Sequence, residues 1–341
     1  MHKLLLPLLI LTLFLASCSS RIQNEGKQNA KGKYQGKDTM LLDKNSMHIN
    51  PMNDFGMTAS NVFFYYSNLA RATKFYTETL GLNVAADYGF AKILQVAQTS
   101  FITLVDETKG MHKSSEPKSV AIALITDQLD EWFDYIEKQD VEIKAPYNPK
   151  EGRPHHGFVA IDPEGYFLEF ERFNIHEENE KLSPVLDKSP TIYPPNDQNT
   201  TVPPGLGFKA TVVWFYYKDM EGIQRFYEDV MGFDLIVDQG WAKIYPISPS
   251  GYFGLVDEQR GMHNFAEQKA VTMSFWTDRL DDWYAYASTH EAIKMRSRKI
   301  EDGSPEYRAF VGYDPEGYYI EWDVFNDVPD NEELLKILKE Q

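Results

Sequence analysis

The chain has 341 residues, a length that corresponds to about two domains with linkers. Its many aromatic residues, ordinary charge content and lack of a long biased tract are typical of a globular protein. The formal net charge of -17 at pH 7 argues against nucleic acid as a partner, because nucleic acid binds surfaces rich in Lys and Arg.

The first 18 residues have the pattern of an export signal. A short charged start precedes an apolar run from Leu4 to Leu15, which is too short to span a membrane. The run ends in Leu15-Ala-Ser-Cys18, which contains the only cysteine of the chain. This ending resembles the signal of bacterial lipoproteins, in which the cysteine is lipidated; an ordinary signal peptide with a chance cysteine is the alternative. We therefore expect a signal peptide over 1–18 and an envelope protein anchored through Cys18 to the outer or the cytoplasmic membrane.

The next segment, residues 19–58, is polar and rich in Lys, Gln, Asn and Gly. It shows no sustained periodicity, which predicts a flexible tether between the membrane and the folded part. The alternative is that part of this arm packs on a domain, and Met40-Leu41-Leu42 is the only apolar spot through which it could.

From residue 59 the pattern becomes regular. Apolar residues at i, i+3, i+4 and i+7, such as Leu129, Trp132, Phe133 and Ile136, predict helices, and alternating or continuous apolar runs predict strands. The order is strand, helix and three strands, run twice over residues 59–175. The expected strands are 62–66, 82–86, 90–96, 101–105, 120–125, 141–143, 157–161 and 166–170, with helices over 69–80 and 129–136.

This whole unit then returns. A Pro-rich linker over 176–207, expected to be extended and semi-rigid, separates it from a second copy over 208–328. Gly110-Met-His112 matches Gly261-Met-His263 at an offset of 151 residues, and Asp162 matches Asp314 at 152. The chain is thus a tandem duplication. The end of the chain, 329–341, contains an amphipathic helix that we expect to dock on the second copy.

Each copy closes with an Asp-Pro-Glu-Gly turn and a strand, over Asp162–Phe170 and Asp314–Trp322. Pro and Gly at these places are typical of a tight turn. The alternation that follows leaves Glu169 and Glu321 on strands that are otherwise apolar or aromatic. A carboxylate in such a place needs a hydrogen-bond donor, a cation or water as its partner.

Four features together resemble the vicinal oxygen chelate superfamily of glyoxalase I, bleomycin-resistance proteins and extradiol dioxygenases. They are the first strand followed by Asn68-Leu69, the helix with Phe75-Tyr76, the Leu129-Asp130 helix, and the Asp-Pro-Glu-Gly turn with its trailing Glu. The resemblance implies an α+β fold of two tandem domains, 59–175 and 208–328. Each domain would join two βαβββ modules into a cupped mixed sheet that encloses a ligand cavity.

The resemblance also implies a divalent metal held by the first and last strands of the modules. The matching positions fall at Asn61, Thr103, Ala121 and Glu169 in the first copy and at Val212, Gly254, Thr272 and Glu321 in the second. Only Glu169 and Glu321 are metal-ligand types that the family uses there, and one carboxylate per domain falls short of the three or four ligands of a tight site. We therefore expect no cofactor. The alternative is a divalent metal on Glu169 or Glu321, with His112 or His263 as a further ligand.

Other polar groups have a structural and a functional interpretation. His112 and His263 close the same loop in both copies, and we favour a structural role. His155 and His156 are strand neighbours, so at most one faces a cup. The pair Asp106-Glu107, with its copy at 257–258, fits solvated turn residues better than an acid–base pair.

The predicted ligand-binding residues are cup-facing aromatic side chains and the two carboxylates: Phe63, Tyr65, Phe101, Glu169, Trp214, Tyr216, Tyr252 and Glu321. Such aromatic walls with a carboxylate suit a flat or cationic organic ligand. We therefore predict metal-free binding of a small molecule. A metal-dependent lyase or dioxygenase with an atypical ligand set, and a protein-interaction module with closed cups, are the alternatives.

Overall fold

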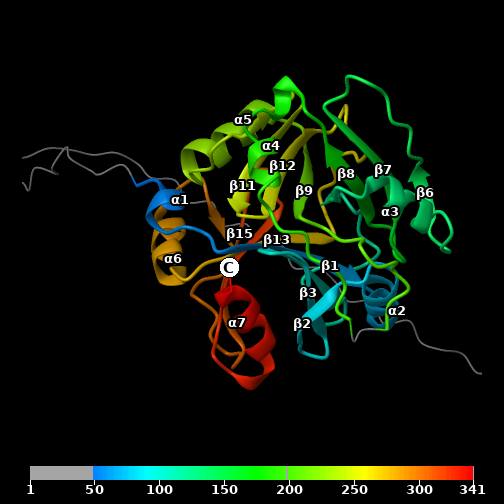
Figure 1. Cartoon of the computed structure of the whole chain (residues 1–341). Helices are drawn as coiled ribbons and strands as arrows, with labels where there is room; N and C mark the ends of the chain where they lie inside the picture. Colours follow the sequence, from blue (N-terminus) through cyan, green and yellow to red (C-terminus); the bar gives the residue numbers. More distant parts are fainter. Residues whose placement is uncertain (1–48, 197–198, 341) are drawn as a thin grey trace, which may run out of the picture. The chain divides into compact units, whose positions relative to one another are not determined.

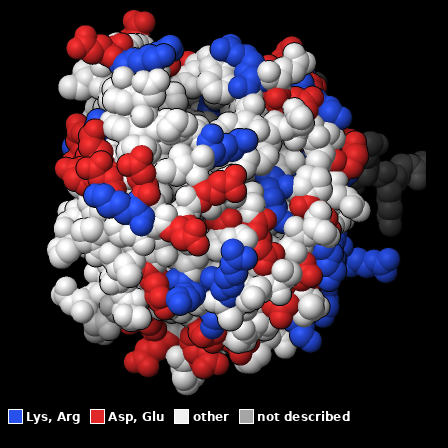
Figure 2. All heavy atoms as spheres, turned by 90° about the vertical axis from the view of Figure 1, so that its right-hand side faces the viewer, with Lys and Arg blue, Asp and Glu red and all other residues white. Residues whose placement is uncertain are grey.

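The computed structural model describes residues 49–196 and 199–340. The predicted signal peptide, Cys18 and most of the predicted tether lie outside this part of the chain. Within it, no helix is long and apolar enough to cross a membrane. Charged side chains of both signs alternate over the face that Figure 2 shows, without a broad basic patch.

Two eight-stranded mixed sheets form the fold, so the predicted α+β class with four βαβββ modules is confirmed (Figure 1). Sheet 1 runs in the order β14 (Lys294–Met295), β15 (Tyr307–Tyr313), β16 (Tyr319–Phe325), β13 (Val271–Trp276), β1 (Ala59–Tyr66), β4 (Ser100–Asp106), β3 (Ala91–Ala97) and β2 (Asn83–Asp87). Sheet 2 runs β10 (Val237–Asp238), β11 (Ala242–Ser248), β12 (Gly251–Asp257), β9 (Ala210–Tyr217), β5 (Val120–Ile125), β8 (Phe167–Phe173), β7 (His155–Ile161) and β6 (Glu142–Ala145). We call their concave faces cup 1 and cup 2.

The modules do not pair in the order in which they follow one another along the chain. Sheet 1 joins the first module of the first repeat to the last module of the second, through antiparallel pairing of β1 with β13. Sheet 2 joins the two middle modules through β5 and β9. The sheets therefore do not coincide with the repeats 59–175 and 208–328, and each cup receives residues from both. The sequence does not reveal this, because the first strands of all modules offer the same kind of apolar edge.

Helices cover the sheet faces that point away from the cups. They are α2 (Leu69–Lys74) and α5 (Met220–Arg225), each continued by a π-helical turn, and α3 (Leu129–Ile136) and α6 (Leu280–Thr289). Their apolar sides share one continuous core with the outer faces of both sheets, including Phe64, Leu168, Phe215 and Ile320. The strand residues of opposite parity, such as Tyr65 and Glu321, face the cups instead.

Two segments that were predicted to be loose pack on this core. Residues 50–58 contain α1 (Pro51–Asp54), and Phe55 packs edge-on against Trp283 with ring centroids 5.6 Å apart. The predicted tether 19–58 thus ends before residue 50. The predicted linker 176–207 contains α4 (Ser183–Leu186), and the amide of Thr201 donates to the Glu78 carbonyl at 2.8 Å. Burial of Leu186 and Val202 shows that the described part of this linker is packed rather than free.

The C-terminal helix α7 (Glu332–Lys339) spans the two walls of sheet 1. It lies beside β2, at the lower end of Figure 1, and buries Leu334 against Ala85 and Ala86. The residue before it, Asn331, accepts a hydrogen bond from Tyr88 on the first repeat at 2.6 Å and donates to the Glu306 carbonyl on the second at 2.7 Å. The helix therefore docks on both repeats, where the sequence predicted only the second.

The Asp-Pro-Glu-Gly turns are the junctions between the sheets. Asp162 accepts the hydroxyls of Tyr66 at 2.6 Å and Tyr76 at 3.2 Å, and also the amides of its own turn. Glu164 accepts the amides of Ser67 and Asn68, which lead into α2. Asp314 and Glu316 repeat both arrangements in the second half. The repeated motif thus has a structural role. It connects the strand that follows each turn, β8 or β16, to the start of a helix on the other sheet, α2 or α5.

Tyr166, which follows the first turn, forms hydrogen bonds with the backbone of sheet 1. Its hydroxyl accepts the amide of Tyr65 on β1 at 2.8 Å and donates to the carbonyl of Ala270, the residue before β13, at 2.6 Å. These two strands meet in the middle of sheet 1. Tyr318 does the same in sheet 2, with the Tyr216 amide at 3.1 Å and the Ser119 carbonyl at 2.7 Å. Each sheet is thus held at its central seam by a tyrosine of the other.

Tyr166→Phe and Tyr318→Phe should each lower the free energy of unfolding by about 1–3 kcal/mol, because each leaves a buried amide and a buried carbonyl without a partner. Chemical denaturation measures this. Tyr193→Phe is the matched control, since its ring is 51% exposed. Losses in the two buried variants no larger than in this control would contradict the role of the hydroxyls.

Candidate functional site

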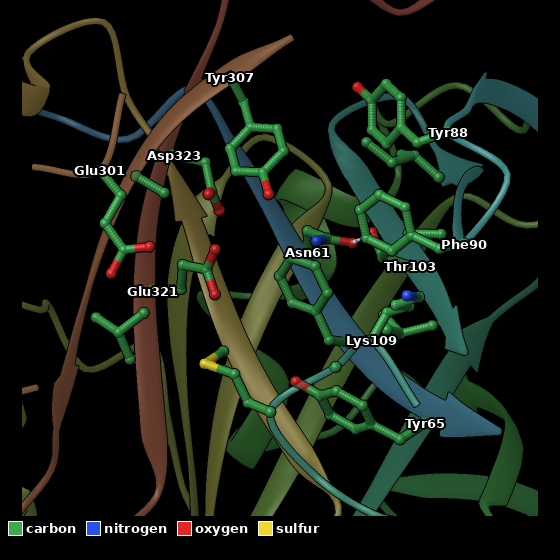
Figure 3. Close-up of a pocket in the computed structure, with 18 of the residues that line it drawn as sticks. Asn61, Tyr65, Tyr88, Phe90, Thr103, Lys109, Glu301, Tyr307, Glu321 and Asp323 are labelled. Atoms are coloured by element: carbon green, nitrogen blue, oxygen red, sulfur yellow. Dashed lines mark hydrogen bonds between the residues drawn. The ribbon is translucent and has the colours of Figure 1, made fainter. Parts of the chain in front are cut away.

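Cup 1 contains a cavity of about 240 Å³ between the two walls of sheet 1 (Figure 3). Residues of the first repeat form one wall and the floor, and residues of the second repeat form the other wall. The lining includes Asn61, Phe63, Tyr65, Tyr88, Phe90, Thr103, Lys109, Met111, Arg296, Glu301, Tyr307, Glu321, Asp323 and Phe325. The predicted cup residues of the first strand, Phe63 and Tyr65, therefore lie with Glu321 rather than with Glu169.

The wall from the second repeat is acidic. Glu321 and Asp323 stand two residues apart on β16 and face the cavity, and Glu301 lies on the same side (Figure 3). Burial, together with the neighbouring Asp323 carboxylate, raises the pKa of Glu321 well above its ordinary value. Burial also raises the pKa of Asp323 to about 6, although Ser274 donates a hydrogen bond to it. The pair therefore carries less negative charge at neutral pH than two exposed carboxylates would.

The floor of cup 1 carries an unpartnered donor. The Oδ1 atom of Asn61 accepts the hydroxyl of Thr103 at 2.9 Å, while its buried Nδ2 atom has no hydrogen-bond partner among the described residues. The side chain is only 1% exposed and lies at the cavity, opposite the acidic wall (Figure 3). A buried amide N–H without an acceptor is costly, so this group favours a ligand that brings one.

The four positions that would hold the family's metal in cup 1 are Asn61, Thr103, Thr272 and Glu321. Asn61 and Thr103 are neutral and bind each other, and the Thr272 hydroxyl shares a hydrogen bond with Tyr65 at 2.8 Å. Only Glu321 can supply an anionic ligand, and its raised pKa favours the protonated form. This donor set does not fit a transition metal, which needs several deprotonated or imidazole ligands.

Cup 2 has the same backbone but is mostly filled. Its cavity is about 100 Å³, and Trp214 occupies the place of Phe63. The ring fits because Gly254 stands where cup 1 has Thr103; a Cβ atom at Gly254 would overlap the indole. The remaining family metal positions in this cup are Ala121, Val212 and Glu169, so cup 2 also lacks a metal-binding set.

The acidic groups of cup 2 are balanced by a histidine of the same cup or by protonation. His155 forms a short ion pair with Glu171, which raises the pKa of His155 to about 9. Burial, together with Glu171, raises the pKa of Glu169 to about 8, so this carboxyl stays largely protonated at neutral pH. His156 points elsewhere and hydrogen bonds to the Lys150 carbonyl at 2.8 Å. As predicted for strand neighbours, one histidine of the pair faces the cup.

Of the other predicted site residues, Phe101 and Tyr252 lie outside the two cavities. Phe101 stacks on Trp276 with ring centroids 4.5 Å apart, under α7. Tyr252 packs beneath cup 2 and borders an open groove beside Met57 and Pro249. Tyr216 lines cup 2 together with Trp214. The pair Asp106-Glu107 caps the following loop. The amide of Thr108 lowers the pKa of Asp106, and hydrogen bonds from the side chain and the amide of Ser114 lower the pKa of Glu107.

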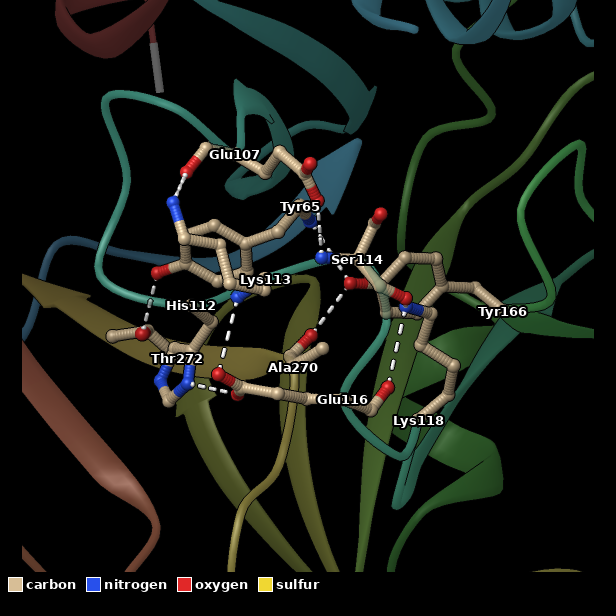
Figure 4. Close-up of polar contacts among 10 residues, drawn as sticks. All are labelled: Tyr65, Glu107, His112, Lys113, Ser114, Glu116, Lys118, Tyr166, Ala270 and Thr272. Atoms are coloured by element: carbon tan, nitrogen blue, oxygen red, sulfur yellow. Dashed lines mark hydrogen bonds and ion pairs between the residues drawn. The ribbon is translucent and has the colours of Figure 1, made fainter. Parts of the chain in front are cut away.

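The loop after β4 lines cup 1 with Lys109, Gly110 and Met111. Figure 4 shows the polar contacts of the residues that follow in this loop. His112 is buried, packs against Tyr65 and Tyr319, and binds Glu116 through Nδ1 at 2.8 Å. Burial is the main cause that lowers the pKa of His112. His263 packs on Phe167 in the same way, and burial lowers its pKa to about 4. Neither histidine lines a cavity, so both act as packing residues in these loops.

Sequence reasoning missed Asp323, Tyr307 and the two cations at the mouth, Arg296 and Lys109. Asp323 could have been predicted, because strand alternation places it on the same face as Glu321, two residues earlier. Tyr307 lies on β15 and Arg296 in the loop after β14, whereas Lys109 lies in the loop after β4 of the first repeat. Only the pairing of β1 with β13 brings them into one cup.

Residues 58–170 match the model of the Glyoxalase/Bleomycin resistance protein/Dioxygenase superfamily. This part of the chain belongs to that superfamily. The fold of glyoxalase I from Zea mays is similar over 83% of this chain and 95% of that one, at 15% identity and a TM-score of 0.53. A protein of Bacillus subtilis subsp. subtilis described as a candidate dioxygenase covers 78% and 85%, at 14% identity and a TM-score of 0.53. No curated protein matches the chain.

The family model confirms the predicted superfamily for residues 58–170, and the solved structures confirm the tandem arrangement of the fold. At such low identity the likeness of the solved structures concerns the fold alone. The residues at the metal positions of cup 1 do not form a metal site, because three of the four are neutral and hydrogen bonded and the fourth, Glu321, has a raised pKa. Among residues 49–196 and 199–340, no group of three or more His, Cys, Asp or Glu side chains is placed to hold a metal ion.

Trp214→Ala should open cup 2 and lower the free energy of unfolding by about 3–5 kcal/mol, because it leaves a large cavity in a packed site. Phe63→Ala is the matched control at the equivalent position, where the ring already borders the open cavity of cup 1, so its loss should be smaller. Chemical denaturation and a crystal structure of each variant measure both effects. Equal losses, or an unchanged cup 2, would show that Trp214 does not fill it.

Proposed function

We propose that this is a lipid-anchored envelope protein whose cup 1 binds a small organic molecule without a transition metal. The single observation that carries the proposal is the cavity of about 240 Å³, with aromatic walls, an acidic pair and an unpartnered amide. Ligand sites have this character, with mostly apolar walls and a few converging polar groups. A cavity of about 150 Å³ is enough for benzene, so cup 1 has room for one ring with substituents.

A metal-dependent lyase or dioxygenase remains the alternative that the names of the related structures suggest, as glyoxalase I. The neutral side chains of Asn61, Thr103 and Thr272 favour metal-free binding over this alternative, because they are already engaged with one another or with Tyr65. The third hypothesis, a protein-interaction module with closed cups, suits cup 2, where Trp214 fills the space. The cavity of cup 1 favours ligand binding over it.

A thermal-shift screen of small aromatic amines, alcohols and acids should yield ligands whose binding is unchanged by a chelator. Glu321→Gln should weaken the binding of the amines at least tenfold, because a bound ammonium group favours the ionised form of Glu321 and an amide cannot supply that charge. Glu169→Gln in the filled cup 2 is the matched control and should change affinity less than twofold. Mass spectrometry of protein purified without chelator or histidine tag should find no stoichiometric metal. Near-stoichiometric Ni, Zn, Mn or Fe that disappears in Glu321→Ala would overturn metal-free binding.

The anchor rests on the sequence pattern around Cys18. In cells that express the full chain, labelled palmitate should enter the wild-type protein, which should sediment with the membrane fraction. Cys18→Ser should abolish both, because no other thiol is present. Ser17→Ala leaves the thiol in place and serves as the control. Labelling that persists in Cys18→Ser would contradict the anchor.

A further inference from the structure

The two cups share an acidic pair but differ in how its charge is balanced. In cup 2 the pair is Glu169 and Glu171, and His155 on β7 supplies a positive charge through its ion pair with Glu171. In cup 1 the pair is Glu321 and Asp323, and the residue in the place of His155 is Tyr307, which is neutral. Both strands have the same register, with His155 opposite Phe173 and Tyr307 opposite Phe325.

The acidic pair of cup 1 has no ion-pair partner among the described residues. Glu321 and Asp323 are 8% and 3% exposed, and the nearest cation that acts on the pair is the exposed Arg296, which offsets the rise in the pKa of Glu321 only in small part. Glu301 adds a third carboxylate to the same cavity. Buried carboxylates without a counter-charge are costly, so this wall favours an occupant that brings a positive charge.

A second observation defines the rest of the occupant. The Nδ2 atom of Asn61 is buried at the floor of the same cavity and has no acceptor among the described residues. An ammonium group cannot accept a hydrogen bond, so the ligand needs an acceptor near its charged nitrogen. The aromatic rings of Phe63, Phe90 and Tyr307 border the space between these groups and suit both an aromatic body and a cation.

We infer that cup 1 binds a small aromatic monoamine that carries a hydroxyl or carbonyl oxygen beside its protonated nitrogen. This inference rests on the proposed function of cup 1 and specifies its ligand. The ammonium group binds the acidic pair Glu321 and Asp323, and the oxygen accepts the Asn61 amide. Arg296 and Lys109 at the exposed mouth disfavour a second positive charge at the outer end of the ligand.

Three compounds of one shape but different charge test the inference: 2-amino-1-phenylethanol, 1-phenylethane-1,2-diol and mandelate. Isothermal titration calorimetry on the wild-type protein should give the lowest Kd for the amine, about ten- to hundredfold below that of the diol, because a charged hydrogen bond is the stronger one. Mandelate should bind most weakly. 2-Phenylethylamine, which lacks the oxygen, should bind more weakly than 2-amino-1-phenylethanol.

Two variants separate the contributions. Tyr307→His gives cup 1 the cation that cup 2 already has, so it should remove the preference for the amine over the diol. Asn61→Ala should remove the preference for 2-amino-1-phenylethanol over 2-phenylethylamine, while the preference for a cation remains. Circular dichroism and thermal unfolding show whether each variant is folded. Phe173→Tyr in cup 2 is a control that should leave all four affinities unchanged.

The outcomes distinguish this inference from the proposed function. If mandelate or the diol binds to cup 1 as tightly as the amine, the inference is overturned while ligand binding in cup 1 stands. If neither these compounds nor any hit of the wider screen binds in a manner sensitive to Glu321→Gln, the proposed function fails as well. Preference for the amine that persists in Tyr307→His would also overturn the inference, because the acidic pair would then not be its cause.

Discussion

Two tyrosine hydroxyls hold the arrangement on which the site depends. Tyr166 and Tyr318 each leave their own sheet and bind the central seam of the other, where two first strands meet. Each hydroxyl accepts a hydrogen bond from one backbone amide and donates one to a backbone carbonyl. These buried backbone groups at the seam therefore have hydrogen-bond partners. The two tyrosines therefore stabilise the pairing of modules across the repeats in both sheets. Cup 1 depends on this pairing, because its two walls come from different repeats.

The same backbone then supports two different interiors. Thr103 and Phe63 leave cup 1 open, whereas Gly254 and Trp214 fill cup 2 with an indole ring. Because interiors are close-packed, a larger ring needs a smaller neighbour, and the exchange of Thr for Gly provides it. One cup is thus packed by its own side chains, and the other contains an open cavity.

Much of the fold was predictable because its determinants are local. The strand alternation, the helix faces and the repeated turn each lie within a few residues, so the four modules and their superfamily could be predicted from sequence. The pairing of modules could not be predicted, because the sequences of β5 and β13 offer β1 equivalent apolar edges, and contacts between distant residues decide that β1 pairs with β13. The predicted site residues were therefore grouped with the wrong carboxylate: Tyr65 lies with Glu321, and Tyr216 with Glu169.

The loop that closes cup 1 also limits how a ligand can enter. This segment carries the chain from β4 of sheet 1 to β5 of sheet 2, and its Gly110 lies so close to the Tyr65 ring that a Cβ atom there would overlap it. Its last residue, Ser119, accepts the seam hydroxyl of Tyr318. A loop held at both ends by buried contacts cannot swing open without loosening the sheet junction. The exposed side chains that border the mouth are Phe90, Lys109 and Arg296, and these can move without disturbing that junction.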